Sequence, residues 1–322
     1  MTPKVYILST LEALKTPIVL EDIGSMSLED AIYAKVMSKK FRKVAPGEPA
    51  VRLTKEAIRL FVAEKKPIRI IQMFGGNKLW RFEEAPEIDW AELFSLTYFV
   101  QWARYIASVY EHGVHFEYFS QDICVETMNN VPLTQTQKYH ESFGELLRFV
   151  APYLPKNVTV TYTRLYDLYD SPDDYRRELE EGKKVILNKY EGKLPVMTDA
   201  MKAATELNVQ LKPGQDSDPL WREKVEFEHQ AIFETKTLKK ICEDPYKIWT
   251  CPTYYEDSVV TGSTKRSFAK FWAGVGALVP DGEKYAELVI TPKQLETMSF
   301  KWEDISIPGL NSRNFKKIRI VK

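Results

Sequence analysis

The sequence predicts an α/β fold in which a largely parallel sheet is flanked by helices, and three observations support this prediction. Apolar runs rich in β-branched or aromatic residues at 67–73, 114–119 and 157–163 are typical of buried strands. Helical patterns at 90–110 and 134–150 lie between these runs. Connections of this length join parallel strands by right-handed crossovers. The chain of 322 residues is long enough to bury a large core without disulfides or metal ions.

Residues 1–66 are expected to form a helical N-terminal region. Ser27 is placed to open one helix, and Thr54 is placed to cap another over 55–65. Apolar residues of this second helix recur at the spacing of a helix that lies against a core.

Residues 67–212 are expected to form the core of the fold. Asp89 caps the long apolar helix at 90–110, and Gly113 breaks the chain before the second strand. The charged segment 171–207 is also expected to be helical.

Residues 213–322 are expected to add a helix and a β-rich part. Asp218 is a candidate cap for this helix, with Pro219 at its first position. Candidate strands lie at 270–279, 285–291 and 315–321. They either extend the same sheet or form a small flanking lobe.

Composition narrows the class of protein. Lys plus Arg and Asp plus Glu both number 45, so the formal net charge is zero and a broad nonspecific nucleic-acid surface is disfavoured, although a local basic groove remains compatible. Three cysteines without CxxC spacing suit a reducing compartment and supply no zinc framework. No signal peptide or long apolar span is present in the sequence, which predicts a cytoplasmic protein without a membrane segment.

The first candidate site is the exit of the strand at 67–73. Gly75 and Gly76 allow a sharp turn that exposes backbone N–H groups, and Asn77 follows them. Lys78 and Arg81 add positive charge suited to a phosphate or carboxylate. The alternative is a tight turn with the lysine in solvent. The expected partner is therefore an anionic small molecule.

The second candidate site is on the strand at 114–119. Its alternation places His115 and Glu117 on one face, where a buried ionisable pair could act in catalysis. The same pair could instead face a solvated edge or bond to each other. Ser120 and Asp122, at the end of this strand, are better candidates for polar contacts with a substrate.

Further candidates follow the second and third strands. Asn129 and Asn130, expected in a loop, are either turn formers or hydrogen-bond partners of a substrate. Arg164 follows the third strand at the expected rim of a cleft. Lys265 and Arg266 lie in a segment of hydroxyl residues and glycine, a composition that suits either phosphate binding or an ordinary exposed loop.

No metal ion or other cofactor is predicted. His112 and His115 flank Gly113, between a helix end and a strand, so their spacing fixes no geometry. His140 and His229 lie alone on predicted helices. The sequence has neither a Gly-x-Ser-x-Gly elbow nor a defensible Cys–His pair.

Short motifs in the central segment resemble those of the isocyanide synthase family. A strand leads to a Phe-x-x-Lys-type loop, an acidic helix start follows, and a Tyr-x-x-Gly break precedes a strand that ends in Ser and Asp. The matching residues are Phe74 with Lys78, Pro86 and Glu87 with Glu92, Tyr110 with Gly113, and Ser120 with Asp122. The resemblance covers about residues 67–150. The chain departs from the pattern where Gly-Gly-Asn replaces a proline before the lysine, and where Gln121 separates Ser120 from Asp122.

The resemblance implies a Rossmann-like synthase that joins the amine of an amino acid to a phosphorylated sugar. Lys78 and Arg81 would hold phosphate or carboxylate, and Asp122 would serve as a polar group or general base. We therefore expect a metal-independent transferase or synthase that acts on a phosphorylated or carboxylated small molecule by electrostatic clamping and general acid–base catalysis. One alternative is a transferase that modifies a base within nucleic acid, which the neutral charge does not favour. The other is a non-catalytic module that binds an anionic metabolite. The sequence gives no oligomeric state.

Overall fold

The centre of the molecule is a parallel sheet. The structure is a computed structural model that describes residues 1–75, 78–251, 258–260 and 268–322. The sheet has the order β3-β2-β1-β4-β5, and each of these neighbouring pairs is parallel. The prediction of an α/β fold with a largely parallel sheet flanked by helices is confirmed. The five strands are β1 (Ile68–Phe74), β2 (Val114–Ser120), β3 (Val158–Arg164), β4 (Ile248–Cys251) and β5 (Val259–Val260).

The register of the sheet brings three strand ends together. Phe74 of β1 lies opposite Ser120 of β2, which lies opposite Arg164 of β3. The carboxyl ends of these strands therefore meet at one edge, where open parallel sheets bind their ligands.

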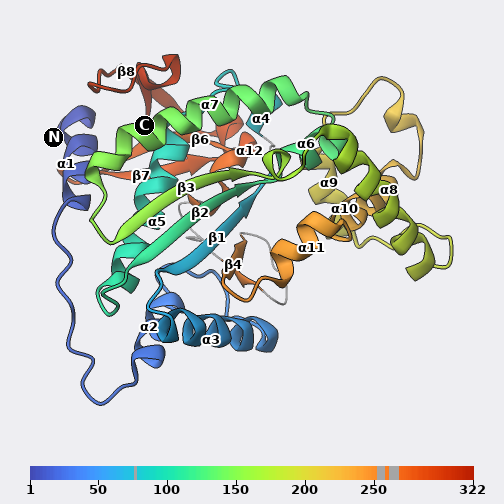
Figure 1. Ribbon diagram of the computed structural model, residues 1–322. Coiled ribbons are helices and arrows are strands. Elements are labelled where there is room, and N and C mark those ends of the chain that lie inside the picture. The colour runs from blue at the N-terminus through green and yellow to red at the C-terminus, as the bar shows by residue number, and fades with distance from the viewer. Residues whose placement is uncertain (76–77, 252–257, 261–267) are drawn as a thin grey trace.

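Helices cover both faces of this sheet (Figure 1). Ile70, Phe116 and Tyr118 face the layer that contains α5 (Trp90–Ala107) and α7 (Leu133–Val150). Ile71 and Phe119 face the opposite layer. This second layer contains α6 (Asp122–Asn129), α8 (Pro172–Lys189), α10 (Trp221–Phe233) and α11 (Lys236–Glu243).

A second, mixed sheet packs on α5. Its order is β7-β6-β9-β8, with β6 and β9 parallel and the two outer pairs antiparallel. Since α5 lies between two sheets, it is apolar nearly all round, as a helix in such a position must be. The strands are β6 (Val275–Asp281), β7 (Lys284–Ile290), β8 (Phe300–Asp304) and β9 (Lys317–Val321).

Short helices complete the described part of the chain. The N-terminal region is helical, as expected, and it begins with a helix that was not singled out. The remaining α-helices are α1 (Pro3–Leu14), α2 (Leu28–Val36), α3 (Glu48–Ala63), α4 (Lys78–Arg81), α9 (Asp199–Asn208) and α12 (Pro292–Thr297). The 3-10 turns are η1 (Ala151–Tyr153), η2 (Tyr166–Leu168), η3 (Gln215–Ser217), η4 (Phe268–Ala273) and η5 (Arg313–Phe315).

Three predicted helix starts or ends differ from the structure. Thr54 lies inside α3, which begins after Gly47 because Pro49 already fits the first helical turn. The helix expected to begin at Pro219 begins at Trp221, since Asp218 instead accepts a hydrogen bond from the Leu220 N–H in a turn. The loop expected before Pro132 is the helix α6, which ends at Asn129.

The C-terminal strands also differ from the prediction. The first part of 270–279 belongs to the 3-10 turns of η4, and the strand itself begins at Val275. The aromatic side chains of η4 pack against α5 and the first sheet. The strands β4, β5 and β8 were not predicted, because each is too short to show a clear strand pattern. The segment 213–322 thus extends the first sheet through β4 and β5 and builds the second sheet with its other strands.

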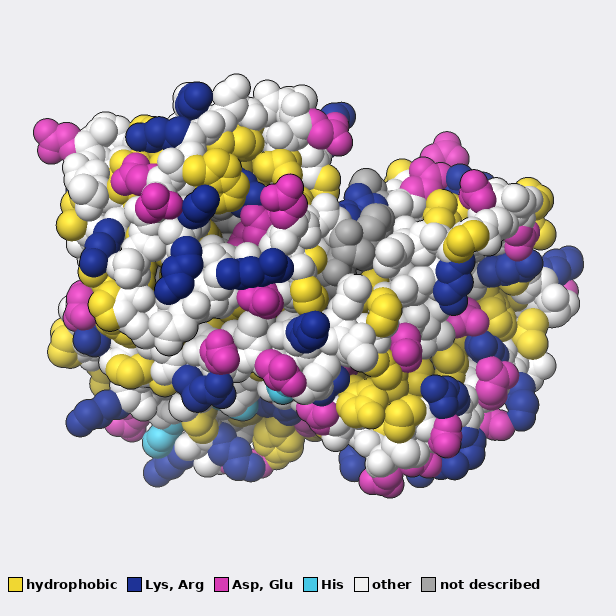
Figure 2. Space-filling model, turned by 90° about the horizontal axis from the view of Figure 1, so that it is seen from above, with side chains coloured by type: hydrophobic (Ala, Val, Ile, Leu, Met, Phe, Trp, Pro, Cys, Tyr) yellow, Lys and Arg dark blue, Asp and Glu magenta, His cyan; other side chains and the backbone are white. Residues whose placement is uncertain are grey.

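Within the described residues, no helix is both long and apolar enough to cross a membrane. On the face shown in Figure 2, acidic and basic side chains are interspersed over the surface.

Candidate active site

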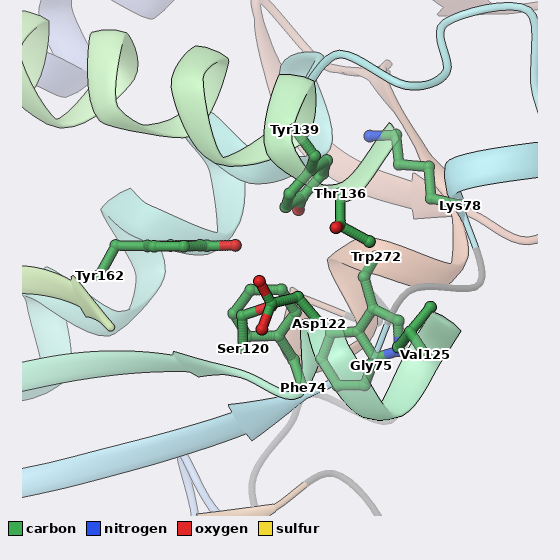
Figure 3. Close-up of a pocket in the computed structure, with 10 residues that line it drawn as sticks. All are labelled: Phe74, Gly75, Lys78, Ser120, Asp122, Val125, Thr136, Tyr139, Tyr162 and Trp272. Carbon is green, nitrogen blue, oxygen red and sulfur yellow. The ribbon is translucent and has the colours of Figure 1, made fainter. Parts of the chain in front are cut away.

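An inner cavity lies at the carboxyl ends of β1, β2 and β3. Its free space is small, with room for about one water-sized group. Figure 3 shows that its polar side chains come from the strand ends and from α4, α6 and α7. Lys78, Ser120, Asp122, Thr136, Tyr139 and Tyr162 are the polar members of this lining, and Phe74, Gly75, Val125 and Trp272 are the others.

Asp122 is held by an arginine at the floor of the inner cavity. Its Oδ2 accepts a hydrogen bond from Nε of Arg164 at 2.6 Å, and its Oδ1 accepts one from the Tyr166 N–H at 3.0 Å. The arginine also donates from Nη1 to Oε1 of Gln137 at 2.5 Å. Both charged side chains are buried. Burial raises the pKa of Asp122 in spite of the opposing effect of Arg164.

Two hydroxyl groups lie beside this carboxylate. The Tyr162 hydroxyl and the Asp122 carboxylate point toward one another across the inner cavity (Figure 3). Burial raises the pKa of Tyr162, while a hydrogen bond with Ser120 acts in the opposite direction. The tyrosine therefore remains a neutral hydroxyl that can donate a hydrogen bond at physiological pH.

Lys78 belongs to a buried charge cluster behind the cavity wall. Its Nζ lies 2.7 Å from Oδ1 of Asp89 and 2.6 Å from Oε2 of Glu92. The Tyr139 hydroxyl donates to Oε1 of Glu92 at 2.9 Å. Burial alone would lower the pKa of Lys78, but the two carboxylates more than offset it and the pKa is raised. The ammonium stays charged, and its charge is compensated within the protein.

The capping box of α5 positions these carboxylates. Asp89 accepts from the Ala91 N–H at 2.7 Å, and Glu92 accepts from the Asp89 N–H at 2.7 Å. Burial raises the pKa of Glu92 to about 7, with Lys78 opposing and Asp89 reinforcing the shift. This carboxyl can therefore take up or release a proton near neutral pH.

A glycine of the second sheet completes the cluster. The Gly276 N–H donates to Oδ2 of Asp89 at 3.2 Å. A Cβ at this position would lie 2.4 Å from Cβ of Trp90 and 2.5 Å from the Ala91 nitrogen, so β6 can approach the start of α5 this closely only with glycine.

The residues predicted at the strand exit take different places. Gly75 and Lys78 line the inner cavity. Arg81 does not line it and donates to the Glu206 carbonyl oxygen at 3.4 Å. Gly76 and Asn77 lie outside the described residues.

His115 and Glu117 lie away from the inner cavity. Glu117 forms an ion pair with Nη2 of Arg69 at 2.8 Å and accepts a hydrogen bond from Thr163 at 2.5 Å. The His115 ring shares a hydrogen bond with the Thr161 hydroxyl at 2.8 Å. These partners come from β1 and β3. On the sheet face opposite α5, His115 and Glu117 therefore connect neighbouring strands of the sheet.

The remaining predicted residues also divide. Arg164 does not line the inner cavity, but it donates a hydrogen bond to Asp122, which does. Nδ2 of Asn129 donates to the Asn208 carbonyl oxygen at 2.8 Å, and Asn130, with a positive φ at the end of α6, donates to the Gln210 carbonyl oxygen at 2.8 Å. The two contacts attach the end of α6 to the last residue of α9 and to the segment that follows it. Lys265 and Arg266 lie outside the described residues.

Several site residues escaped sequence reasoning. Tyr139, Tyr162 and Trp272 come from elements remote in sequence, and no local pattern separates them from core aromatics. The pairing of Asp89 with Glu92 was readable as a capping box, but its bond to Lys78 depends on the tertiary fold. Among the described residues, no group of three or more His, Cys, Asp or Glu side chains is placed to hold a metal ion.

A parallel sheet of the order β3-β2-β1-β4-β5, with a polar cavity beyond its strand ends, defines a Rossmann-like α/β fold. PvcA from Pseudomonas aeruginosa, an isocyanide synthase, is a solved structure with a similar fold: the match covers 92% of this chain and 100% of that chain, at 14% sequence identity and a TM-score of 0.62. The resemblance to the isocyanide synthase family is thus confirmed at the level of the fold, far beyond residues 67–150. No protein-family model and no curated sequence matches the chain.

Proposed function

We propose that the protein is a biosynthetic transferase or synthase, and that its inner cavity receives the amino group of an amino acid. The observation that carries this proposal is the charge balance around the cavity. When Glu92 is ionised, the two cations Lys78 and Arg164 are paired with three carboxylates. Asp122 lines the cavity, and Asp89 and Glu92 lie behind its wall. An ammonium group would offset the excess negative charge, and it would do so in a buried place where such an interaction is strong.

Asp122 would act as the acceptor of the amine proton. An amine attacks an electrophile only in its neutral form, so an acceptor must take its proton first. The raised pKa of Asp122 makes this carboxylate a better base than an exposed aspartate, and the bond to Arg164 fixes its direction. Ser120 and Tyr162 would donate hydrogen bonds to the oxygen on which charge develops.

The second substrate would be the phosphorylated sugar that the family resemblance implies. A role for Lys78 in holding its anionic group requires a second state of the site, different from the one that attracts the ammonium group. In this second state Glu92 carries a proton, because two ionised carboxylates otherwise compensate the charge of Lys78. The pKa of Glu92, at about 7, makes that protonated state accessible. The fold shared with PvcA supports the reaction class, and the cavity supports the handling of an amine.

The test compares free amino acids with their N-acetylated forms. Isothermal titration calorimetry of a panel of L-amino acids should identify a ligand whose N-acetyl form binds at least about tenfold more weakly, the equivalent of about 1.4 kcal/mol. In Asp122→Asn this preference should shrink. Equal binding of the free and acetylated forms throughout the panel would contradict the proposal.

A second measurement separates catalysis from sensing. Asp122→Asn should retain measurable binding of the second substrate and lose product formation, followed by mass spectrometry with the amino acid and a sugar phosphate. The matched variant Glu117→Gln removes the charge of the carboxylate on the opposite sheet face and should keep turnover. Loss of turnover in both variants to the same degree would assign the effect to the fold.

A further inference from the structure

A second and larger cavity adjoins the inner one. This outer chamber lies between the carboxyl end of β1 and the helices α6, α9 and α10, and it encloses about 1360 Å³ including the space open to solvent. The two cavities share four lining residues, Phe74, Gly75, Val125 and Trp272. The two cavities therefore adjoin at these four residues. The combined space exceeds the needs of an amino group and the atoms next to it.

Methionine side chains give the outer chamber an adaptable apolar wall. Met73 comes from β1, Met128 from α6 and Met201 from α9. Methionine is flexible and polarisable, so such a wall accommodates apolar groups of different shapes. Val209 and Val225 extend the same apolar surface. This lining differs from that of the inner cavity, which is dominated by charged groups and hydroxyls.

One buried polar atom of the outer chamber has no hydrogen-bond partner among the described residues. Nε2 of Gln121 is buried and makes no hydrogen bond within the described residues. A buried donor without an acceptor costs about 1–3 kcal/mol, so such an atom commonly meets a ligand or water. Gln121 lies between Ser120 and Asp122 in the chain, and hence at the junction of the two cavities. It is also the residue that departs from the Ser–Asp motif of the isocyanide synthases.

We infer that the outer chamber is a subsite for an extended apolar group of the substrate, and that Gln121 donates a hydrogen bond to an acceptor atom on that group. The inference rests on the proposed function in one respect: the group belongs to the substrate whose amine lies in the inner cavity. The subsite would then select substrates by the length and polarity of their side chains.

Simple alcohols test the chamber without the inner cavity, since they carry neither an amine nor an acid. In ligand-observed NMR titrations, affinity should rise about threefold per added methylene from butanol to hexanol to octanol. Benzyl alcohol and phenylethanol form a second arm that distinguishes an aromatic from an alkyl preference. Absence of any dependence on apolar size in both arms would overturn the inference.

A matched pair of variants locates the binding. Ala203 and Ala204 of α9 are both exposed, but only Ala204 lines the outer chamber. Ala204→Trp fills the chamber and should lower octanol affinity at least about tenfold. Ala203→Trp adds the same side chain to the same helix and should leave it unchanged. Equal effects of the two variants, or none, would contradict the assignment.

The role of Gln121 is tested with two isosteric amino acids, L-2-aminooctanoate and O-propyl-L-homoserine, which differ by an ether oxygen in the side chain. Wild-type protein should favour the ether over the hydrocarbon relative to Gln121→Met, by about three- to tenfold. An unchanged preference would remove Gln121 from the subsite.

The two proposals can fail separately. If alcohols bind with the expected dependence on length, but free and N-acetylated amino acids bind alike, the chamber stands and the amine site fails. If the amine preference holds and Ala204→Trp changes neither alcohol nor amino-acid binding, the amine site stands and the chamber fails.

Discussion

Two carboxylates on or next to β2 form ion pairs with arginine, and only one of them faces a cavity. Asp122 bonds to Arg164 at 2.6 Å, and Glu117 bonds to Arg69 at 2.8 Å. Glu117 is further enclosed by Thr163, and its arginine also pairs with Asp244 at 2.9 Å. Asp122 instead presents its carboxylate to open space beside two hydroxyls. A buried ion pair is thus a poor marker of function by itself, and the space next to it is the informative feature.

The largest expected difference between the two pairs is in turnover. Asp122→Asn should lower kcat by about 10²–10⁴-fold, because the proton acceptor is lost while the side chain keeps its shape. Glu117→Gln should change kcat by less than about threefold. The measurement is steady-state kinetics on variants whose folding is verified by circular dichroism. A large loss of kcat in Glu117→Gln would break the comparison.

The charge cluster behind the cavity should dominate stability. Lys78→Met leaves Asp89 and Glu92 side by side without a cation, which should cost about 3–5 kcal/mol of unfolding free energy. Urea denaturation at neutral pH measures this loss. Arg69→Met should cost less, because Arg69 and its partner Asp244 are partly exposed to water. A smaller loss for Lys78→Met than for Arg69→Met would reverse the ranking.

Glu92 should make the free energy of unfolding depend on pH. Its pKa is about 7 in the folded protein and 4.5 without burial, so the folded state holds the extra proton between these values. Stability from this group is therefore fully present below about pH 4.5 and is lost as the pH rises through about 7, by roughly 1–3 kcal/mol. Glu92→Gln should flatten this part of the profile in urea titrations. An unchanged slope would contradict the buried protonation.

The smallest expected effect concerns the hydrogen bond between Tyr139 and Glu92. Tyr139→Phe removes the donor and leaves the ring, which should cost about 1–2 kcal/mol of unfolding free energy. The same variant should shift the dependence of unfolding free energy on pH, because the Glu92 carboxyl loses a hydrogen-bond donor. Thr163→Val makes the corresponding change beside Glu117 and should leave kcat unaltered. A fall of kcat in Thr163→Val alone would place function on the opposite face.

Much of the fold was readable from the sequence because it depends on local patterns. The strands at 67–73, 114–119 and 157–163 and the capping box at Asp89 appear within a residue or two of the prediction. The strand ends then located Ser120, Asp122 and Lys78 at a common edge, because parallel strands align there. The mixed second sheet was not foreseen as a separate sheet, since nothing in three isolated runs determines which partners they take.

The interior of the site depended on contacts that the sequence does not display. Lys78 was predicted to bind an anion, and the structure pairs it with Asp89 and Glu92, which lie eleven and fourteen residues further along the chain. Tyr139 and Trp272 approach from still more distant segments. The anion-binding role of Lys78 and Arg81 stays a prediction, and it now depends on the protonation state of Glu92.

The close approach of Gly276 to α5 has a consequence for biosynthesis of the molecule. The backbone of β6 supplies one of the hydrogen bonds that fix Asp89, although these residues are 187 positions apart in the chain. The cavity of the first sheet can thus reach its final geometry only after the ribosome has released the strand at Val275–Asp281. A nascent chain that holds all three central strands would still lack this hydrogen bond to Asp89, and so would the first sheet grafted alone into another protein.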